Sequence, residues 1–482
     1  MIAGYAWPQS VLPGEEVELF VSTTAPRFDV EVVRQGAEDE PVHAERGVPG
    51  CEHPVPEDVG SQGCRWPAAL RIRAGADWRS GLHLVRLRTG EGEQAEAFFV
   101  VRAARPGRTL LVLSTSTWAA YNEWGGPSFY TGGHVSSLER PLPKGFLERP
   151  SPERFRAARV GELDPGEAGA YLKAGYSFWV VSAGWSAWER LFARWAEREG
   201  IALDYAVSQD LDAIPGLLEP YTLYLSVGHD EYWSAGMRDA VEGFVERGGR
   251  AAFFSGNTAF WQIRWERGHR AAVGYKMDIQ EDPVFGTSEE RTLSTMWSDP
   301  LVGRPENHLT GVSFTRGGYA HLENAPHGSG GYTVWRPEHW AFEGLALRPG
   351  DLVGAEPVVV GYECDGCELQ LVDGRPVPTG ADGTPPDFQV LATAPAHLWE
   401  SHERPAALPA RGVGELDWVA ERLGGADTAE NRERFAHGRA VMGSFTRGRG
   451  AVFTTGCTDW AFGLEDPAVA RITRNVIGRF LG

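Results

Sequence analysis

Hydrophobic and polar side chains alternate with a period of two along the first hundred residues. Val17, Leu19 and Val21 follow this alternation, and an apolar run at 97–101 closes the region. A period of two is typical of strands that bury one face, and glycine-containing turn pairs separate the runs. The pattern therefore predicts an N-terminal all-β domain over residues 1–105, a β-sandwich of the immunoglobulin-like kind.

From Thr109 onward short apolar strands alternate with helical segments. We expect strands at 109–113, 201–206, 221–227 and 251–254, amphipathic helices at 185–198 and 234–247, a hairpin that turns at 447–450, and a last helix at 467–481. This alternation predicts a doubly wound, mostly parallel α/β domain over 106–482, a three-layer arrangement like that of glutamine amidotransferases. Its periodicity fails between about 266 and 360, where we expect an irregular β-rich insertion.

The formal net charge of −19 opposes binding to nucleic acid, because a polyanion needs a basic surface. No stretch approaches the roughly 18 consecutive apolar residues of a membrane span, and the first residues lack the basic start of a signal peptide. We therefore expect a cytoplasmic protein without a nucleic-acid or membrane partner. Five cysteines, an odd number, do not describe a disulfide scaffold.

Polar and aromatic side chains follow three of the predicted strands directly, in the segments 114–130, 228–233 and 255–258. In an open parallel sheet, the segments that leave the carboxyl ends of the strands converge on the ligand-binding crevice. The candidate site therefore lies at this edge of the sheet.

The densest titratable group in these segments is His229-Asp230-Glu231. In an extended chain residues i and i+2 project to one side, so His229 and Glu231 can face one space while Asp230 turns away. One of the two would then bind a metal and the other would move protons. An acid here could equally cap the helix that opens near Ser234, and both interpretations stay open.

Four further residues are ambiguous when taken alone. Tyr121 and Tyr130 lie in a segment rich in glycine and proline, where tyrosine usually only packs, but paired phenolic oxygens suit ferric iron if a metal is near. Asn257 could donate to an oxyanion or cap a helix. Glu363, between an aromatic and turn residues, would by itself be an ordinary loop acid.

Taken together, these segments resemble the N,N-dimethylformamidase large (beta) subunit family. The resemblance is carried by Thr117-Trp118-Ala119-Ala120-Tyr121-Asn122, Ser128-Phe129-Tyr130, Gly228-His229-Asp230-Glu231-Tyr232-Trp233, Ser255-Gly256-Asn257 and Gly361-Tyr362-Glu363-Cys364-Asp365. It implies a mononuclear Fe(III) held by Tyr121, Tyr130 and Glu231. It also implies a catalytic-site histidine at His229, a substrate-positioning asparagine at Asn257 and an acid beside the site at Glu363.

The resemblance implies a metal-dependent hydrolase that cleaves the C–N bond of a small, N-substituted formamide-like amide. A ferric Lewis acid would polarise the carbonyl and activate water, while His229 or Glu363 moves protons. The small partner subunit of the characterised enzyme is not evident in this chain. The oligomeric state stays open, with a homo-oligomer among the alternatives.

Two other functions compete with this hypothesis. Cys457 follows a predicted strand and a sharp turn, as the nucleophile of a glutamine-amidotransferase-like enzyme would, but the sequence indicates no base for it. A non-catalytic binding protein is the other alternative, because 18 tryptophans offer aromatic contact surface.

Overall fold

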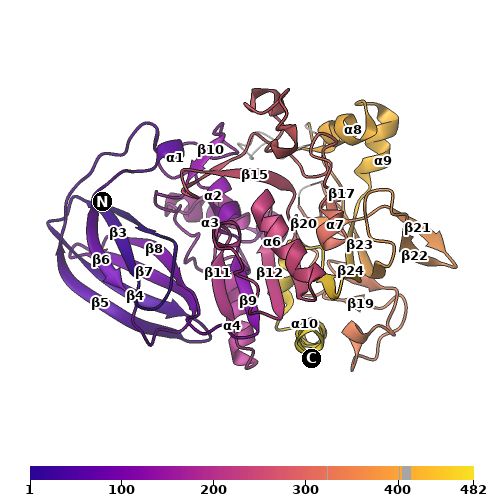
Figure 1. The fold of residues 1–482 in the computed structure, drawn as a ribbon, viewed down its shortest axis with the longest axis horizontal. Helices are drawn as coiled ribbons and strands as arrows, with labels where there is room; N and C mark the ends of the chain where they lie inside the picture. The colour runs from indigo at the N-terminus through magenta and orange to yellow at the C-terminus, as the bar shows by residue number, and fades with distance from the viewer. Residues whose placement is uncertain (323, 401, 404–413) are drawn as a thin grey trace. The chain divides into compact units, whose positions relative to one another are not determined.

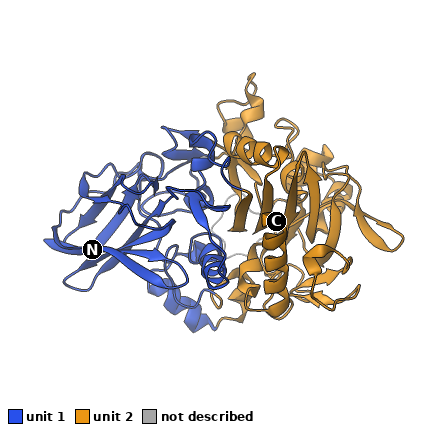
Figure 2. Ribbon diagram, turned by 60° about the horizontal axis from the view of Figure 1, so that its bottom comes forward, with its two compact units in different colours: residues 1–152, 164–221, 265–273 blue, residues 153–163, 222–264, 274–482 orange. Residues whose placement is uncertain are grey.

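The computed structural model describes residues 1–322, 324–400, 402–403 and 414–482 (Figure 1). These residues form two compact units, and each unit has its own core (Figure 2). Unit 1 comprises residues 1–152, 164–221 and 265–273, and unit 2 comprises 153–163, 222–264 and 274–482. The predicted domain boundary at residue 105 lies inside unit 1. That residues 1–105 form a separate domain stays a prediction.

Two sheets fill the first hundred residues of unit 1. One has the order β1 (Ile2–Trp7), β3 (Glu16–Thr23), β6 (Ala68–Arg73), and the other β2 (Ser10–Val11), β8 (Gln94–Val101), β7 (Gly81–Thr89), β4 (Arg27–Gln35), β5 (Asp39–Pro49). Apolar side chains of both sheets belong to one buried cluster, for example Leu19 and Ile72 with Val32 and Phe99. The period-two alternation thus marks real strands, while the immunoglobulin-like arrangement stays a prediction.

The remainder of unit 1 contains a short parallel strand pair, β9 (Thr109–Leu113) with β11 (Asp204–Val207), and an antiparallel pair, β10 (Val135–Ser137) with β16 (Ala271–Val273). Its helices are α1 (Val59–Gln62), α2 (Thr115–Ala120), α3 (Pro165–Lys173), η2 (Phe178–Val181), α4 (Glu189–Arg198) and α5 (Asp210–Ala213). Helix α4 is shorter than predicted and begins at Glu189.

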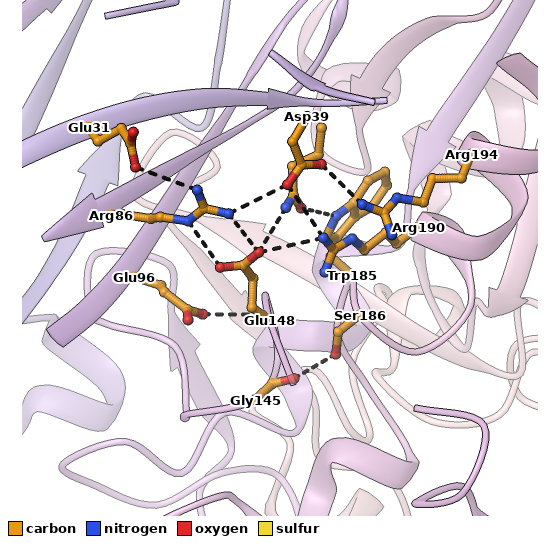
Figure 3. Close-up of polar contacts among 11 residues, drawn as sticks. Glu31, Asp39, Arg86, Glu96, Gly145, Glu148, Trp185, Ser186, Arg190 and Arg194 are labelled. Carbon is orange, nitrogen blue, oxygen red and sulfur yellow. Dashed lines mark hydrogen bonds and ion pairs between the residues drawn. The ribbon is translucent and has the colours of Figure 1, made fainter. Parts of the chain in front are cut away.

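Unit 1 also contains a half-buried network of ion pairs, which we call the paired cluster (Figure 3). It consists of Glu31, Asp39, Arg86, Glu148, Arg190 and Arg194. Arg86 binds Glu148 through two nitrogens, at 3.1 Å and 2.9 Å. Arg194 lies 3.1 Å from Asp39. Three cations thus meet three carboxylates, so the charges of the paired cluster balance.

Unit 2 is built on a sheet with the strand order β12 (Leu223–His229), β14 (Arg250–Gly256), β25 (Gly450–Thr454), β24 (Arg439–Arg447), β23 (Gln389–Pro395), β18 (Tyr332–Val334), β19 (Leu352–Val353). Helices α6 (Ala235–Glu246) and α10 (Pro467–Leu481) both contact β14. Helix α10 occupies the predicted range, because Asp466 caps its first turn and Pro467 fits the first helical position.

This sheet is mixed, which corrects the prediction of a mostly parallel one. Strands β12, β14 and β25 are parallel to one another, but β24, β23, β18 and β19 are joined to β25 by antiparallel pairing. The reason is the predicted hairpin at 447–450, since a tight turn can only connect antiparallel neighbours. The fold is α/β with a large mixed sheet, and a doubly wound arrangement stays a prediction.

The segment 266–360 supplies β18 and β19 to the large sheet, and its description as an irregular insertion stays a prediction. In unit 2 it contributes β17 (Ser313–Tyr319), α7 (Asn307–Thr310) and the turns η3 (Ile279–Glu281), η4 (Glu290–Thr292) and η5 (Trp340–Phe342). The other elements of unit 2 are η1 (Ala157–Glu162), β13 (Tyr232–Ser234), β20 (Glu363–Gly366), β21 (Leu369–Val372), β22 (Arg375–Pro378), α8 (Leu416–Gly424), α9 (Ala429–Ala436) and η6 (Thr458–Gly463), together with β15 (Trp261–Glu266), whose last two residues belong to unit 1. Among the described residues, no helix is both long and apolar enough to cross a bilayer.

Candidate active site

The carboxyl ends of β12 and β14 place two predicted site residues side by side. His229 is the last residue of β12 and pairs with Gly256, the last residue of β14, so Asn257 leaves the sheet beside the histidine. A Cβ atom on Gly256 would lie 2.7 Å from the carbonyl oxygen of Glu363. Glycine at this position therefore lets the strand that carries Glu363 approach the end of β14.

Four side chains meet there, and we call them the histidine cluster: His229, Glu231, Asn257 and Glu363. His229 Nε2 lies 2.7 Å from Glu363 Oε2 and 3.3 Å from Glu231 Oε2. Asn257 Nδ2 donates to Glu363 Oε2 at 2.9 Å. All four residues are buried, so these contacts act with little screening by water.

The helix-cap interpretation of this segment is wrong. Ser234, not an acid, caps α6, and its hydroxyl accepts from the backbone N–H of Met237 at 3.2 Å. Asp230 turns away from the histidine and accepts from Ser226 Oγ at 2.7 Å. Asn257 caps no helix either, because β15 follows it, and its φ of 47° is a conformation that asparagine tolerates better than most residues.

The contacts of Glu363 determine its protonation. Burial opposes its ionisation, but the charge of His229 and the hydrogen bonds from His229 and Asn257 together lower the pKa of Glu363 below its ordinary value. Asn257 Nδ2 faces this carboxylate, and among the residues that the structure describes, the buried Asn257 Oδ1 has no hydrogen-bond partner. The histidine cluster thus offers an ionised base and an acceptor atom that is left for another molecule.

Sequence reasoning missed three residues beside the histidine cluster: Lys276, Tyr319 and Glu415. Burial lowers the pKa of Lys276 to about 8 against the opposing charges of Glu231, Glu415 and Glu363. Burial and the charge of Glu363 raise the pKa of Glu415 to about 8. Tyr319, opposite Glu363 in the β17–β20 pair, donates to Glu415 at 3.1 Å.

One signal could have indicated Lys276: it is one of only three lysines in the chain. No comparable signal marks Glu415, which precedes α8 far along the chain. The aromatic ring of Tyr362 lies edge-on to His229, with 5.9 Å between ring centroids, and forms part of the surroundings of the histidine cluster.

Tyr121 and Tyr130 belong to unit 1, where they form a pair. Tyr130 Oη donates to Tyr121 Oη at 2.7 Å, and the rings stack with centroids 4.3 Å apart. Both are buried, and Trp179 packs against both rings. Tyr121 ends helix α2 instead of lying in an irregular loop, because the polar segment after β9 forms that short helix.

The donor chemistry of the tyrosine pair fits the predicted iron. Two phenolic oxygens at 2.7 Å are hard donors at the separation of neighbouring ligands, and hard oxygen donors suit ferric iron. Elsewhere in the described chain, no group of three or more His, Cys, Asp or Glu side chains is placed to hold a metal ion. Glu231 lies in unit 2, so its convergence with the tyrosines stays a prediction.

Cys457 does not have the surroundings of a nucleophile. It is completely buried at the start of η6, and burial raises the pKa of its thiol to about 12. A reactive cysteine needs a low pKa and access to substrate. All five cysteines are free thiols.

Known proteins resemble this chain over most of its length. The family described as N,N-dimethylformamidase beta subunit-like, C-terminal, matches residues 29–474. The chain belongs to this family. Among its curated relatives are N,N-dimethylformamidase beta subunits of Paracoccus aminophilus and an Alcaligenes species, each 23% identical over 468 residues. The matches cover 87% of this chain but 54% of each relative, so the chain spans about half the length of these N,N-dimethylformamidase subunits.

Proposed function

We propose that the chain hydrolyses the C–N bond of a small amide, of the N-substituted formamide class, at the histidine cluster. The observation that supports this most is the contact of Glu363 with both His229 and Asn257, at 2.7 Å and 2.9 Å, in a buried site at the carboxyl ends of two parallel strands. Membership of the family supports the same chemistry.

The proposed proton transfers use atoms of the histidine cluster. Glu363 Oε2, kept ionised by its neighbours, takes a proton from the attacking water, and His229 Nε2 is placed to pass a proton on to the departing amine nitrogen. Asn257 positions the substrate, since its Oδ1 is left without a partner while its Nδ2 holds Glu363 in place. Exclusion of water strengthens each of these interactions.

The proposal includes a single ferric iron held by Tyr121, Tyr130 and Glu231. When bound, this ion would supply Lewis-acid chemistry to the amide carbonyl and to water. The close phenolic pair and the buried carboxylate provide the oxygen donors that such an ion prefers.

The relatives are named beta subunits, which raises the question of whether this chain also needs a partner subunit. We propose that the chain acts without a small partner subunit, alone or as a homo-oligomer. Light scattering of the purified chain, together with its amidase activity, tests this. Activity that requires an added subunit would contradict it.

Metal analysis and the Tyr121→Phe variant test the proposed function. We expect iron near one equivalent, a visible tyrosinate-to-iron absorption band, and release of amine from N-substituted formamides. Tyr121→Phe should lose the band and most of the iron, whereas Tyr176→Phe, a tyrosine of unit 1 outside the pair, should keep both. A metal-free protein that Cys457→Ala inactivates would instead support the thiol enzyme.

A further inference from the structure

A cleft of unit 2 lies at the opposite end of the strands from the histidine cluster. Its volume is about 1030 Å³, and its lining includes Arg250, at the start of β14, and Val452, near the start of β25. Strand β14 spans seven residues, which at roughly 3.3 Å per residue separates its two ends by about 20 Å. The cleft is therefore separate from the candidate active site.

Three arginines line this cleft: Arg250, Arg336 and Arg479. None of them has a carboxylate within ion-pair distance among the described residues. Arg336 Nε is also buried without a hydrogen-bond partner. In a chain of net charge −19, where the arginines of the paired cluster are matched by acids, three unmatched arginines around one cavity indicate a binding site for an anion.

Both acidic side chains that line the cleft, Glu338 and Asp387, have ion-pair or hydrogen-bond partners. Glu338 binds Arg375 at 2.8 Å. Asp387 accepts from the backbone N–H and the hydroxyl of Thr446, at 2.9 Å and 2.6 Å. Arg375 thus offsets the charge of Glu338, which Arg336 also attracts, while Asp387 keeps its charge. The three arginines of the cleft still outnumber this one acid without an ion-pair partner among the described residues.

His339 contributes a polar but uncharged wall. Its Nδ1 accepts from the backbone N–H of Ala341 at 3.2 Å, so Nε2 carries the hydrogen and donates to Ser444 Oγ at 3.2 Å. Burial and the charge of Arg336 lower the pKa of His339 to about 4, so the ring is neutral at pH 7. The cations of the cleft are its arginines.

Trp340 adds a planar surface to the same cleft. Its ring is only half-buried, and it rests on Phe480 and Phe453 with ring centroids 5.7 Å and 6.1 Å apart. A half-buried indole held by two aromatic neighbours is a rigid platform on which a flat ring can stack.

We propose that this cleft binds a small ligand that joins a planar aromatic ring to a phosphate or carboxylate group. The ring stacks on Trp340, and the anion is held by Arg336 and Arg479. A cavity of this volume encloses a ligand of that size. The proposal does not depend on amide hydrolysis, because it uses none of the residues of the histidine cluster.

Calorimetric titration of the whole chain with adenosine monophosphate and with benzoate tests the proposal. At least one of the two should bind, and its uncharged counterpart, adenosine or benzyl alcohol, should bind at least tenfold more weakly. Which probe binds identifies the anion as phosphate or carboxylate. Raising the salt to about 0.5 M should weaken binding, because ions screen the arginines.

Arg336→Gln and Arg479→Gln should each weaken binding by about tenfold, which is typical for loss of a charge-assisted hydrogen bond. Arg471→Gln is the matched control, since Arg471 is also exposed on α10 but does not line the cleft. Thermal melting confirms that each variant is folded. Absence of binding by both anions, equal binding of the uncharged probes, or wild-type affinity in both cleft variants would overturn the proposal.

Discussion

Two clusters of charged side chains in this protein differ in how their charges are balanced. The paired cluster of unit 1 sets three arginines against three carboxylates, and its members are partly exposed; 22% of the Arg86 side chain and 25% of the Glu148 side chain are accessible (Figure 3). In unit 2, Glu231, Glu363 and Glu415 surround His229 and Lys276, and His229 and Glu363 are 0% and 5% accessible.

The difference in charge balance and burial indicates that the paired cluster is a structural network, whereas the buried cluster of unit 2 is a candidate active site. A balanced and partly exposed network costs little to form, and it links β7 to α4 through the shared acids Asp39 and Glu148. A dry group whose charges are not paired one to one is costly, and the raised pKa of Glu415, about 8, reduces that cost because this carboxyl keeps its proton at pH 7. Such unbalanced clusters are typical of functional sites.

Removal of Lys276 should have the largest effect on stability. We expect Lys276→Met to lower the free energy of unfolding by about 3–5 kcal/mol, because the buried carboxylates of Glu231 and Glu363 lose one of the two cations that stabilise their charges. Urea unfolding followed by tryptophan fluorescence measures it. Lys173→Met, at the exposed end of α3, is the control and should change stability by less than about 0.5 kcal/mol. Equal stability of the two variants would show that Lys276 is not a counter-charge.

Glu363→Gln tests whether the unbalanced cluster performs the proposed proton transfer. We expect kcat for amide hydrolysis to fall about 100-fold, since the amide cannot accept the proton. On the acid side, Glu363 should keep its role as a base at pH values where an ordinary glutamate becomes protonated, because its pKa lies below the ordinary value. Amine release across pH measures both. Glu356→Gln, an exposed acid nearby in sequence, should match the wild type.

The paired cluster should affect stability and leave the chemistry unchanged. Glu148→Gln removes the acid shared by Arg86 and Arg190 and should lower the free energy of unfolding by about 1–3 kcal/mol. Urea unfolding and kcat are measured together. Glu91→Gln, an exposed acid in the turn between β7 and β8, should leave both unchanged. A large loss of kcat in a stable Glu148 variant would contradict the structural role.

Glu96, beside the paired cluster, gives the smallest predicted effect. Burial and the charge of Glu148 raise its pKa to about 7, so the folded chain holds its proton more tightly than the unfolded chain does. Stability from this group is present below about pH 4.5 and is lost as the pH rises through 7. Glu96→Gln should therefore stabilise the chain by about 1–2 kcal/mol at pH 8 but not at pH 4. Thermal melting at both pH values checks this.

The sequence predicted those parts of the fold that depend on local pattern. The period-two runs identified strands such as β3 and β8, and the last helix predicted from the sequence, 467–481, is α10. The direction of strand pairing beyond the 447–450 hairpin was not predictable, because β23, β18 and β19 come from segments far apart in the chain. The short helix α2 was missed, since six residues give too little helical periodicity.

The residues of the candidate site were likewise predictable only where local sequence pattern placed them. His229 and Glu231 could be paired from their spacing, and Asn257 from its place after a parallel strand. Glu363 depended on the family resemblance alone. The scarcity of lysine was the only signal for Lys276, and nothing in the sequence indicated Glu415, since both approach the histidine cluster from segments without hydrophobic periodicity.

Gly256 restricts how this site can be altered. Any side chain there would press against the main chain of Glu363, Cys457 and Thr458, so the gap between the two segments that carry Asn257 and Glu363 is fixed by backbone in direct contact. Variants designed to change the size of the proposed substrate cannot alter that spacing. The side chains around the histidine cluster can be changed more easily than this backbone contact. Tyr362, whose ring stands edge-on to His229, is the first residue to substitute.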